Sequence, residues 1–182
     1  MAEGSDWLEL AKLGVAALTP LVTGLVGVFV LRMGTRIEAA RHVNQQLLNK
    51  RLELFEEIAP KLNDIHCFYQ SIGHWAELDP QEIIRRKRAI DRAVQVNRYL
   101  FSADFWDTYQ RFEQAHFEMF SAPGQPARLR LDVAHLRERL GDCFKQEWLP
   151  QAAPGGGSHE LQGERYQELM HILGQEVRGL RI

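Results

Sequence analysis

The sequence predicts an all-α protein in which a single amino-terminal membrane helix continues into a helical bundle. Three observations support this fold class. An uncharged apolar run extends from Leu13 to Leu31. Most of the remaining chain repeats apolar residues at three- and four-residue steps, the period of a helix with one buried face. Strand-like alternation is limited to the short, ambiguous stretch ARLRLDV.

The apolar run, LGVAALTPLVTGLVGVFVL, lies between Lys12 and Arg32. Crossing a hydrocarbon core of about 30 Å takes roughly 20 helical residues, which this run supplies. A buried core helix is one alternative, but such a helix normally shows polar residues on one face. A cleavable signal is the other, but it has a basic start and a shorter apolar stretch, whereas this amino terminus is acidic. The run therefore favours a transmembrane helix over residues 13–33.

Basic residues near the two ends of the run predict its orientation. Only Lys12 precedes it, whereas several basic residues follow it: Arg32, Arg36, Arg41, Lys50 and Arg51. Positive charge is enriched on the cytoplasmic side of membrane helices. We therefore expect a single-pass membrane protein, with residues 1–12 outside and residues 34–182 forming a cytoplasmic bundle of four to five helices.

The first cytoplasmic segment is expected to extend the membrane helix as one rod. Residues 35–59 contain no glycine or proline and carry two adjacent apolar rows, which make a face wide enough for a bundle core. Pro60 is expected to end or kink this helix, because proline lacks a backbone N–H and clashes with the preceding turn. The apolar stripe then continues to Gly73.

Capping residues and loops predict the remaining helices. Asp79, followed by Pro80 and Glu82, predicts the start of the next helix. Ser102 is expected to cap a helix whose buried face is mainly aromatic. A further helix is expected over residues 129–148, and Ser158 is expected to cap the last one. Glycine and proline between these two helices predict a flexible loop over residues 150–158.

Small residues gather on one side of the apolar run. Small side chains let helix backbones approach closely, so this side is a candidate for contacts between copies of the chain. A pore formed there would be lined by threonines and backbone at glycines, with basic rings near its cytoplasmic mouth. The candidate oligomer-contact and pore-lining residues are Ala16, Thr19, Pro20, Thr23, Gly27, Arg32 and Arg36.

A basic cluster in IIRRKRAIDR forms a second candidate site. Arg85, Arg88 and Arg92 lie on one face of the expected helix, with Arg86 and Lys87 at its sides. Such a cluster can hold the phosphates of lipid or RNA, or dock a partner protein. The alternative is an ordinary solvated helix face. No aromatic residues are interleaved for base stacking, and the net charge of −2 argues against a globally basic nucleic-acid binder.

Two segments place a histidine five residues after an arginine: RFEQAH, with Arg111 and His116, and RLDVAH, with Arg130 and His135. This spacing resembles the motif of the HEPN superfamily, small helical bundles that include many ribonucleases. The resemblance implies that histidine acts as acid or base while arginine stabilises the charged intermediate of RNA cleavage. Phe112 and Leu131 stand where the family usually has a polar residue. The alternative is a hydrogen-bonded core histidine.

The overall layout also resembles the membrane accessory proteins of type VI-B CRISPR systems, which are divergent HEPN-like proteins. The resemblance implies a non-enzymatic, oligomeric effector that perturbs the inner membrane, with the lipid bilayer, further copies of itself and an RNA-guided nuclease or another defence protein as partners. A membrane-tethered ribonuclease and a helical scaffold that docks a cytoplasmic partner are the alternatives. No metal or cofactor is expected. Cys67 and Cys143 are expected to be packed free thiols.

Overall fold

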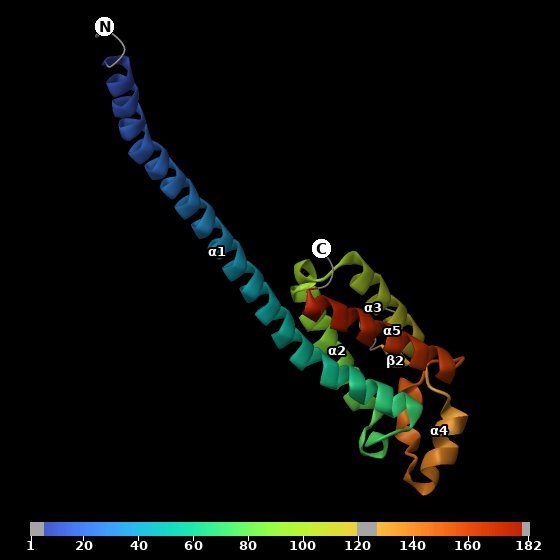
Figure 1. Cartoon of the computed structure of the whole chain (residues 1–182). Helices are drawn as coiled ribbons and strands as arrows, with labels where there is room; N and C mark the ends of the chain where they lie inside the picture. Colours follow the sequence, from blue (N-terminus) through green and yellow to red (C-terminus); the bar gives the residue numbers. More distant parts are fainter. Residues whose placement is uncertain (1–5, 120–126, 180–182) are drawn as a thin grey trace. The chain divides into compact units, whose positions relative to one another are not determined.

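The computed structural model describes residues 6–119 and 127–179, with side-chain surroundings from Val22 onward except at residues 35–37, 39, 40 and 43. The chain divides into two units, residues 1–46 and residues 47–182. The first helix, α1 (Asp6–Gln70), passes from the first unit into the second (Figure 1). The architecture is mostly helical, so the predicted all-α class is confirmed.

The second unit contains the other elements of the described chain. Its α-helices after α1 are α2 (Pro80–Val96), α3 (Ala103–His116), α4 (Val133–Leu140) and α5 (His159–Arg178). Short 3-10 helices are η1 (Trp75–Glu77), η2 (Arg98–Leu100), η3 (Gly141–Cys143) and η4 (Gln146–Gln151). Two short antiparallel strands, β1 (Phe117–Glu118) and β2 (Arg128–Leu129), form the one sheet of the described residues. Strand β2 lies within the ambiguous stretch ARLRLDV.

The prediction of a membrane-spanning helix over residues 13–33 is corrected by the structure. No helix within the described residues is both long and apolar enough to cross a bilayer. The predicted single-pass inner-membrane location, with the amino terminus outside, is therefore wrong.

Side-chain caps begin the helices as the sequence predicts. The Asp79 carboxylate accepts a hydrogen bond from the Glu82 N–H at 2.7 Å and starts α2. The hydroxyl groups of Ser102 and Ser158 accept from Phe105 N–H and Leu161 N–H at 3.2 and 3.3 Å, starting α3 and α5. Each cap satisfies a backbone donor that the first helical turn leaves without a partner.

Two helix boundaries differ from the predictions. Helix α1 continues through Pro60 to Gln70, and Leu62, Ile65 and Phe68 beyond the proline are buried in the core. Burial of this stripe therefore keeps the segment helical despite the lost N–H. The helix expected over residues 129–148 is α4 alone, because Gly141 adopts a positive φ of 51° and ends it. Short 3-10 turns follow.

The core of the second unit lies among α1, α2, α3 and α5, and α5 lies alongside α3 (Figure 1). Arg51 on α1 contacts both η2 and α5. Its guanidinium donates to Leu100 O at 2.9 Å and to Glu176 O at 3.0 Å, and it lies 3.6 Å from the Glu176 carboxylate. That buried carboxylate also accepts from Ser102 N–H at 3.0 Å. The pair therefore fixes α5 against α1 and the start of α3.

The segment predicted as a flexible loop lies against β2. Ala153 N–H donates to Leu129 O at 2.7 Å, and Ala152 forms a parallel bridge with Leu129. Gly157 packs so closely that a β-carbon there would lie 2.5 Å from Arg130 O. Glycine is therefore required at this position.

Candidate binding groove between α1 and α2

The basic cluster of α2 divides into an inward-facing and an outward-facing set. Arg86 pairs with Asp64 of α1 at 2.6 Å and with Glu82 at 2.5 Å. Lys87 is buried, with 3% of its surface exposed, and its ammonium pairs with Asp91 at 2.6 Å and Glu113 at 2.5 Å. Burying a charge is costly unless it is paired, so these two residues serve the packing of α2.

The outward-facing set consists of Arg85, Arg88 and Arg92, all three exposed. Within the described part of the chain, none of the three forms an ion pair. An exposed guanidinium offers up to five N–H donors in a planar fork that matches carboxylate and phosphate groups. These arginines are therefore available to an anionic group from outside the chain.

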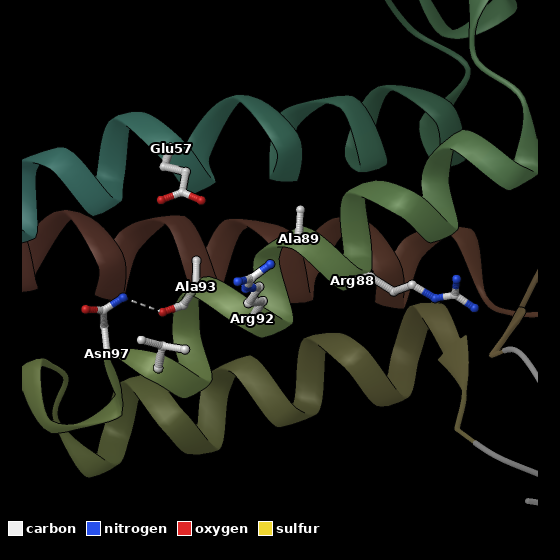
Figure 2. Close-up of a pocket in the computed structure, with 7 residues that line it drawn as sticks. Glu57, Arg88, Ala89, Arg92, Ala93 and Asn97 are labelled. Atoms are coloured by element: carbon white, nitrogen blue, oxygen red, sulfur yellow. Dashed lines mark hydrogen bonds between the residues drawn. The ribbon is translucent and has the colours of Figure 1, made fainter. Parts of the chain in front are cut away.

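Arg88 and Arg92 border a groove of about 580 Å³ between α1 and α2. Figure 2 shows Glu57 extending from α1 toward α2, Arg92 near the middle of the opposite wall, and Arg88 extending away from Arg92. The remaining lining residues come from one side of α2: Ala89, Ala93, Val96 and Asn97. The Asn97 amide donates to Ala93 O at 2.8 Å, which holds this side chain against the end of α2.

The floor of the groove is small and apolar. Ala89 and Ala93 are four residues apart and therefore lie one above the other on the same face of α2. Val96 extends this face and is 67% exposed. Small side chains in such a row allow another backbone to approach closely, while Val96 supplies apolar contact. The groove thus combines an apolar floor with two cationic groups on one wall and one carboxylate on the other.

The structure does not present Arg111 and His116 as an accessible pair. His116 is completely buried, and its Nδ1 lies 2.8 Å from Phe112 O. Burial lowers the pKa of its imidazole to about 4, because the charged form is poorly solvated there. Arg111 is exposed, and its guanidinium donates to Thr108 Oγ1 at 3.0 Å. His116 thus occupies the position of a core histidine.

Arg130 and His135 also have separate surroundings. Arg130 lies after β2, and its Nε donates to Phe117 O at 3.4 Å. The half-buried His135 belongs to the first turn of α4, and its ring centroid lies 5.4 Å from that of His159. The cavity beside His135 is only about 20 Å³, room for a water molecule. Arg130 is not among the residues that line this cavity.

Sequence reasoning missed the buried polar network around Lys87. Tyr109 of α3 donates its hydroxyl proton to Asp91 at 2.5 Å, and Lys87 joins Asp91 to Glu113. Burial, together with the hydrogen bond to Asp91, raises the pKa of Glu113 to about 7. The four-residue spacing of Lys87 and Asp91 could have indicated their contact. The contribution of Glu113 depends on how α3 packs against α2.

Several sequence-predicted contact residues lie in the first unit. The side-chain surroundings of Ala16, Thr19, Pro20 and Arg36 are outside the described residues. Those of Thr23, Gly27 and Arg32 are described, and all three are exposed. Nothing lies within 4 Å of a β-carbon built on Gly27. The helix surface at this glycine is therefore open.

The described residues contain no cluster of three or more histidine, cysteine or acidic side chains that could hold a metal ion. Both cysteines are free thiols. Cys67 is buried as predicted, whereas Cys143 is exposed, so the prediction that it packs in the core is wrong. Cys143 follows Gly141, where α4 has already ended, and this early end leaves it on the surface.

No family model, curated protein or solved structure matches this chain. The resemblance to HEPN-like accessory proteins of CRISPR systems therefore stays a prediction.

Proposed function

We propose that this protein is a non-enzymatic adaptor that docks an acidic, amphipathic helix of a partner protein in the groove between α1 and α2. The observation that carries the proposal is that the basic residues of α2 fall into a set used in packing and a set that lines the groove. Arg86 and Lys87 are used in packing, whereas Arg88 and Arg92 face the groove without an ion-pair partner in the described structure.

The groove has the features that helix-in-groove recognition requires. An apolar stripe on the guest helix would lie on Ala89, Ala93 and Val96, and carboxylates beside that stripe would meet Arg88 and Arg92. Glu57 on the other wall would repel an acidic group there and so favour one orientation of the guest. Such an arrangement provides apolar contact area and also sets the orientation of the guest helix.

The charge pattern favours a protein partner over RNA. A nucleic-acid strand presents phosphates along its whole length and is bound by an extended basic surface. Here the Glu57 carboxylate lines the same groove as the two arginines, and the formal net charge of the chain is −2. A helix with acidic groups along only one flank fits this mixed lining better.

A non-enzymatic role agrees with the surroundings of the two histidines in the Arg–His pairs. A general acid or base must reach the reacting group and exchange a proton near the working pH. His116 is completely buried, and its pKa is lowered to about 4. The cavity that His135 lines does not include Arg130, so the structure does not bring this pair together in one site.

The test is a fluorescence-polarisation titration with a labelled synthetic helical peptide. The peptide has alanines and leucines at four-residue steps on one side and glutamates beside them. We expect binding that weakens about tenfold in Arg88→Ala/Arg92→Ala, the effect of losing two solvent-exposed charge contacts. Arg85→Ala is the matched control, because it removes an exposed arginine of α2 that does not line the groove.

Three results would count against this function: equal binding by wild type and the double variant, equal loss in the Arg85→Ala control, or preference for a lysine-rich peptide of the same length. A parallel titration with single-stranded RNA distinguishes the two classes of macromolecule. Tighter binding of RNA than of the acidic peptide would contradict the proposal.

A further inference from the structure

Three histidines from three helices of the second unit lie close together. They are His66 of α1, His135 in the first turn of α4 and His159 at the start of α5. The ring centroids of His135 and His159 lie 5.4 Å apart, and a charge on His159 is felt by His66. His135 and His159 also line the cavity of about 20 Å³ together with Tyr69 of α1. These rings are therefore part of the contact of α4 with α1 and α5.

The surroundings of His66 and His159 suit uncharged rings. The His66 ring stacks on that of Tyr166 with centroids 3.9 Å apart. Its Nδ1 is buried without a hydrogen-bond partner in the described structure, and so is the Nε2 of His159. A protonated imidazole donates from both nitrogens, so each ring would then carry a charged N–H group with no acceptor. Proton uptake is therefore costly while these rings stay in place.

Neighbouring rings disfavour the charged form as well. Burial lowers the pKa of His66, and a charge on His159 lowers it further. Burial also lowers the pKa of His159, and His135 acts in the same direction. The completely buried His116 of α3 is in turn disfavoured as a cation by a charged His66. A proton on one ring therefore makes the next proton harder to place.

Charged and polar groups around His159 act on it in opposite directions. Arg139 of α4 lowers the pKa of this ring, whereas the Asp132 carboxylate and the Tyr69 carbonyl oxygen raise it. Asp132 also accepts a hydrogen bond from His135 N–H at 3.0 Å as the cap of α4. Burial is the largest influence, so the net change in the pKa of His159 is a lowering. Moving α4 away would remove His135 and Arg139 from this ring together.

Helix α4 is held to the second unit by little buried surface. Of its eight residues only Leu136 is buried, and Val133 and Leu140 are half-buried against the core. By comparison, α5 has five buried residues and α2 has seven. Segments with few buried apolar contacts separate from a fold at the lowest free energy. Repulsion within the histidine cluster would therefore displace α4 first.

We propose that His66, His135 and His159 form an acid-sensitive latch, which holds α4 against α1 and the start of α5 while uncharged and releases α4 on proton uptake. Release separates the charged rings and gives their nitrogens access to water. The rest of the second unit stays folded. Release also uncovers the apolar residues Phe68 and Leu136, which line the cavity beside His135. The second unit thus presents a different surface at pH 5.5 and at pH 7, and this inference is independent of the groove between α1 and α2.

Hydrogen–deuterium exchange of the full-length protein at pH 7 and pH 5.5, corrected for the intrinsic exchange rates, tests the latch. We expect the amides of α4 to exchange about tenfold faster at pH 5.5, because a released ring regains its ordinary pKa of about 6.5 and takes up a proton. The amides of α2 and α5 should remain protected while α4 exchanges. His66→Phe/His159→Gln keeps a ring on Tyr166 and removes both titrations. Its α4 amides should therefore exchange at nearly the same corrected rate at both pH values.

Two exposed charges provide a second test that leaves the core intact. Arg139→Gln should reduce the acceleration at pH 5.5, because it removes a positive charge that disfavours the charged His159. Asp132→Asn keeps a capping side chain and should increase the acceleration, because it removes a carboxylate that favours the charged ring. Arg137→Gln is the matched control. It removes another exposed arginine of α4, whose guanidinium lies over the Phe144 ring, and should respond like the wild type.

Three results would overturn the latch. One is an equal corrected exchange rate of the α4 amides at both pH values in the wild type. The second is exchange of α4 and α5 together at pH 5.5, which would indicate unfolding of the whole unit. The third is an unchanged pH response in His66→Phe/His159→Gln, with far-ultraviolet circular dichroism confirming that this variant is helical.

Discussion

Acidification should destabilise the second unit through His116. This imidazole is completely buried, its Nδ1 is bonded to Phe112 O, and its Nε2 has no hydrogen-bond partner in the described structure. In the unfolded chain its pKa returns to about 6.5. In the folded protein burial lowers the pKa to about 4. The unfolded state therefore binds a proton more readily over this range, and stability falls as the pH drops from about 6.5 toward 4.

The size of the effect follows from the two pKa values. For this histidine alone, the free energy of unfolding falls by about 2 kcal/mol between pH 7 and pH 5, because the unfolded state takes up the proton more readily than the folded state. His116→Phe removes the titration and keeps an aromatic ring among Phe112, Tyr69 and Phe117, its neighbours in the core. The variant should therefore lose less stability on acidification than the wild type, by about the same 2 kcal/mol.

Urea unfolding followed by tryptophan fluorescence at pH 7 and pH 5 measures this difference. Comparing the two proteins is essential, because the raised pKa of Glu113 has the opposite sign: its contribution to stability increases as the pH falls through about 7. That contribution is common to both and cancels. His171→Ala, which removes an exposed histidine of α5, is the control. Equal losses of stability in the wild type and His116→Phe would refute the reasoning.

Three further variants test the packing. Arg51→Ala leaves a buried carboxylate without its cation and should reduce the free energy of unfolding by about 3 kcal/mol in urea titrations; an unchanged midpoint would contradict the role assigned to this residue. Lys87→Met leaves the Glu113 carboxylate without its ammonium partner. The variant should therefore lose more stability at pH 7.5, where this carboxylate is charged, than at pH 5. Equal losses of stability at both pH values would contradict the network. Gly157→Ala forces a β-carbon against Arg130 O and should cost about 2 kcal/mol by thermal unfolding. Gly174→Ala, in open space, should cost nothing, and similar melting temperatures for these two glycine variants would exclude the steric explanation.

Local chemistry predicted the helix starts well. Asp79, Ser102 and Ser158 cap helices in the structure because each cap needs only a side-chain oxygen within three residues of the first free N–H. Interruptions were predicted less well. Pro60 does not end α1, since burial of the following apolar stripe outweighs one lost hydrogen bond. Gly141 ends α4 through its positive φ, a backbone property that the apolar spacing does not reveal.

The candidate site was only partly visible in the sequence. The basic cluster was correctly located on a helix, and its spacing placed Arg85, Arg88 and Arg92 on one face, but the sequence did not show that Lys87 is buried. Lys87 is buried because Glu113, a residue of another helix, supplies a carboxylate at 2.5 Å. The groove needs Glu57, a residue of α1 far from α2 in the chain. Both depend on tertiary packing, which short-range periodicity does not specify.

Photo-crosslinking tests the central claim, docking of an acidic helix between α1 and α2, most directly. The labelled peptide carries a photoreactive residue on its apolar side, and mass spectrometry identifies the residues to which it becomes attached. Crosslinks should concentrate at residues 89–97 of α2 and around Glu57 of α1, and they should decrease in Arg88→Ala/Arg92→Ala but not in Arg85→Ala. Crosslinks concentrated on α4 or α5, or spread evenly over the second unit, would contradict docking in the groove.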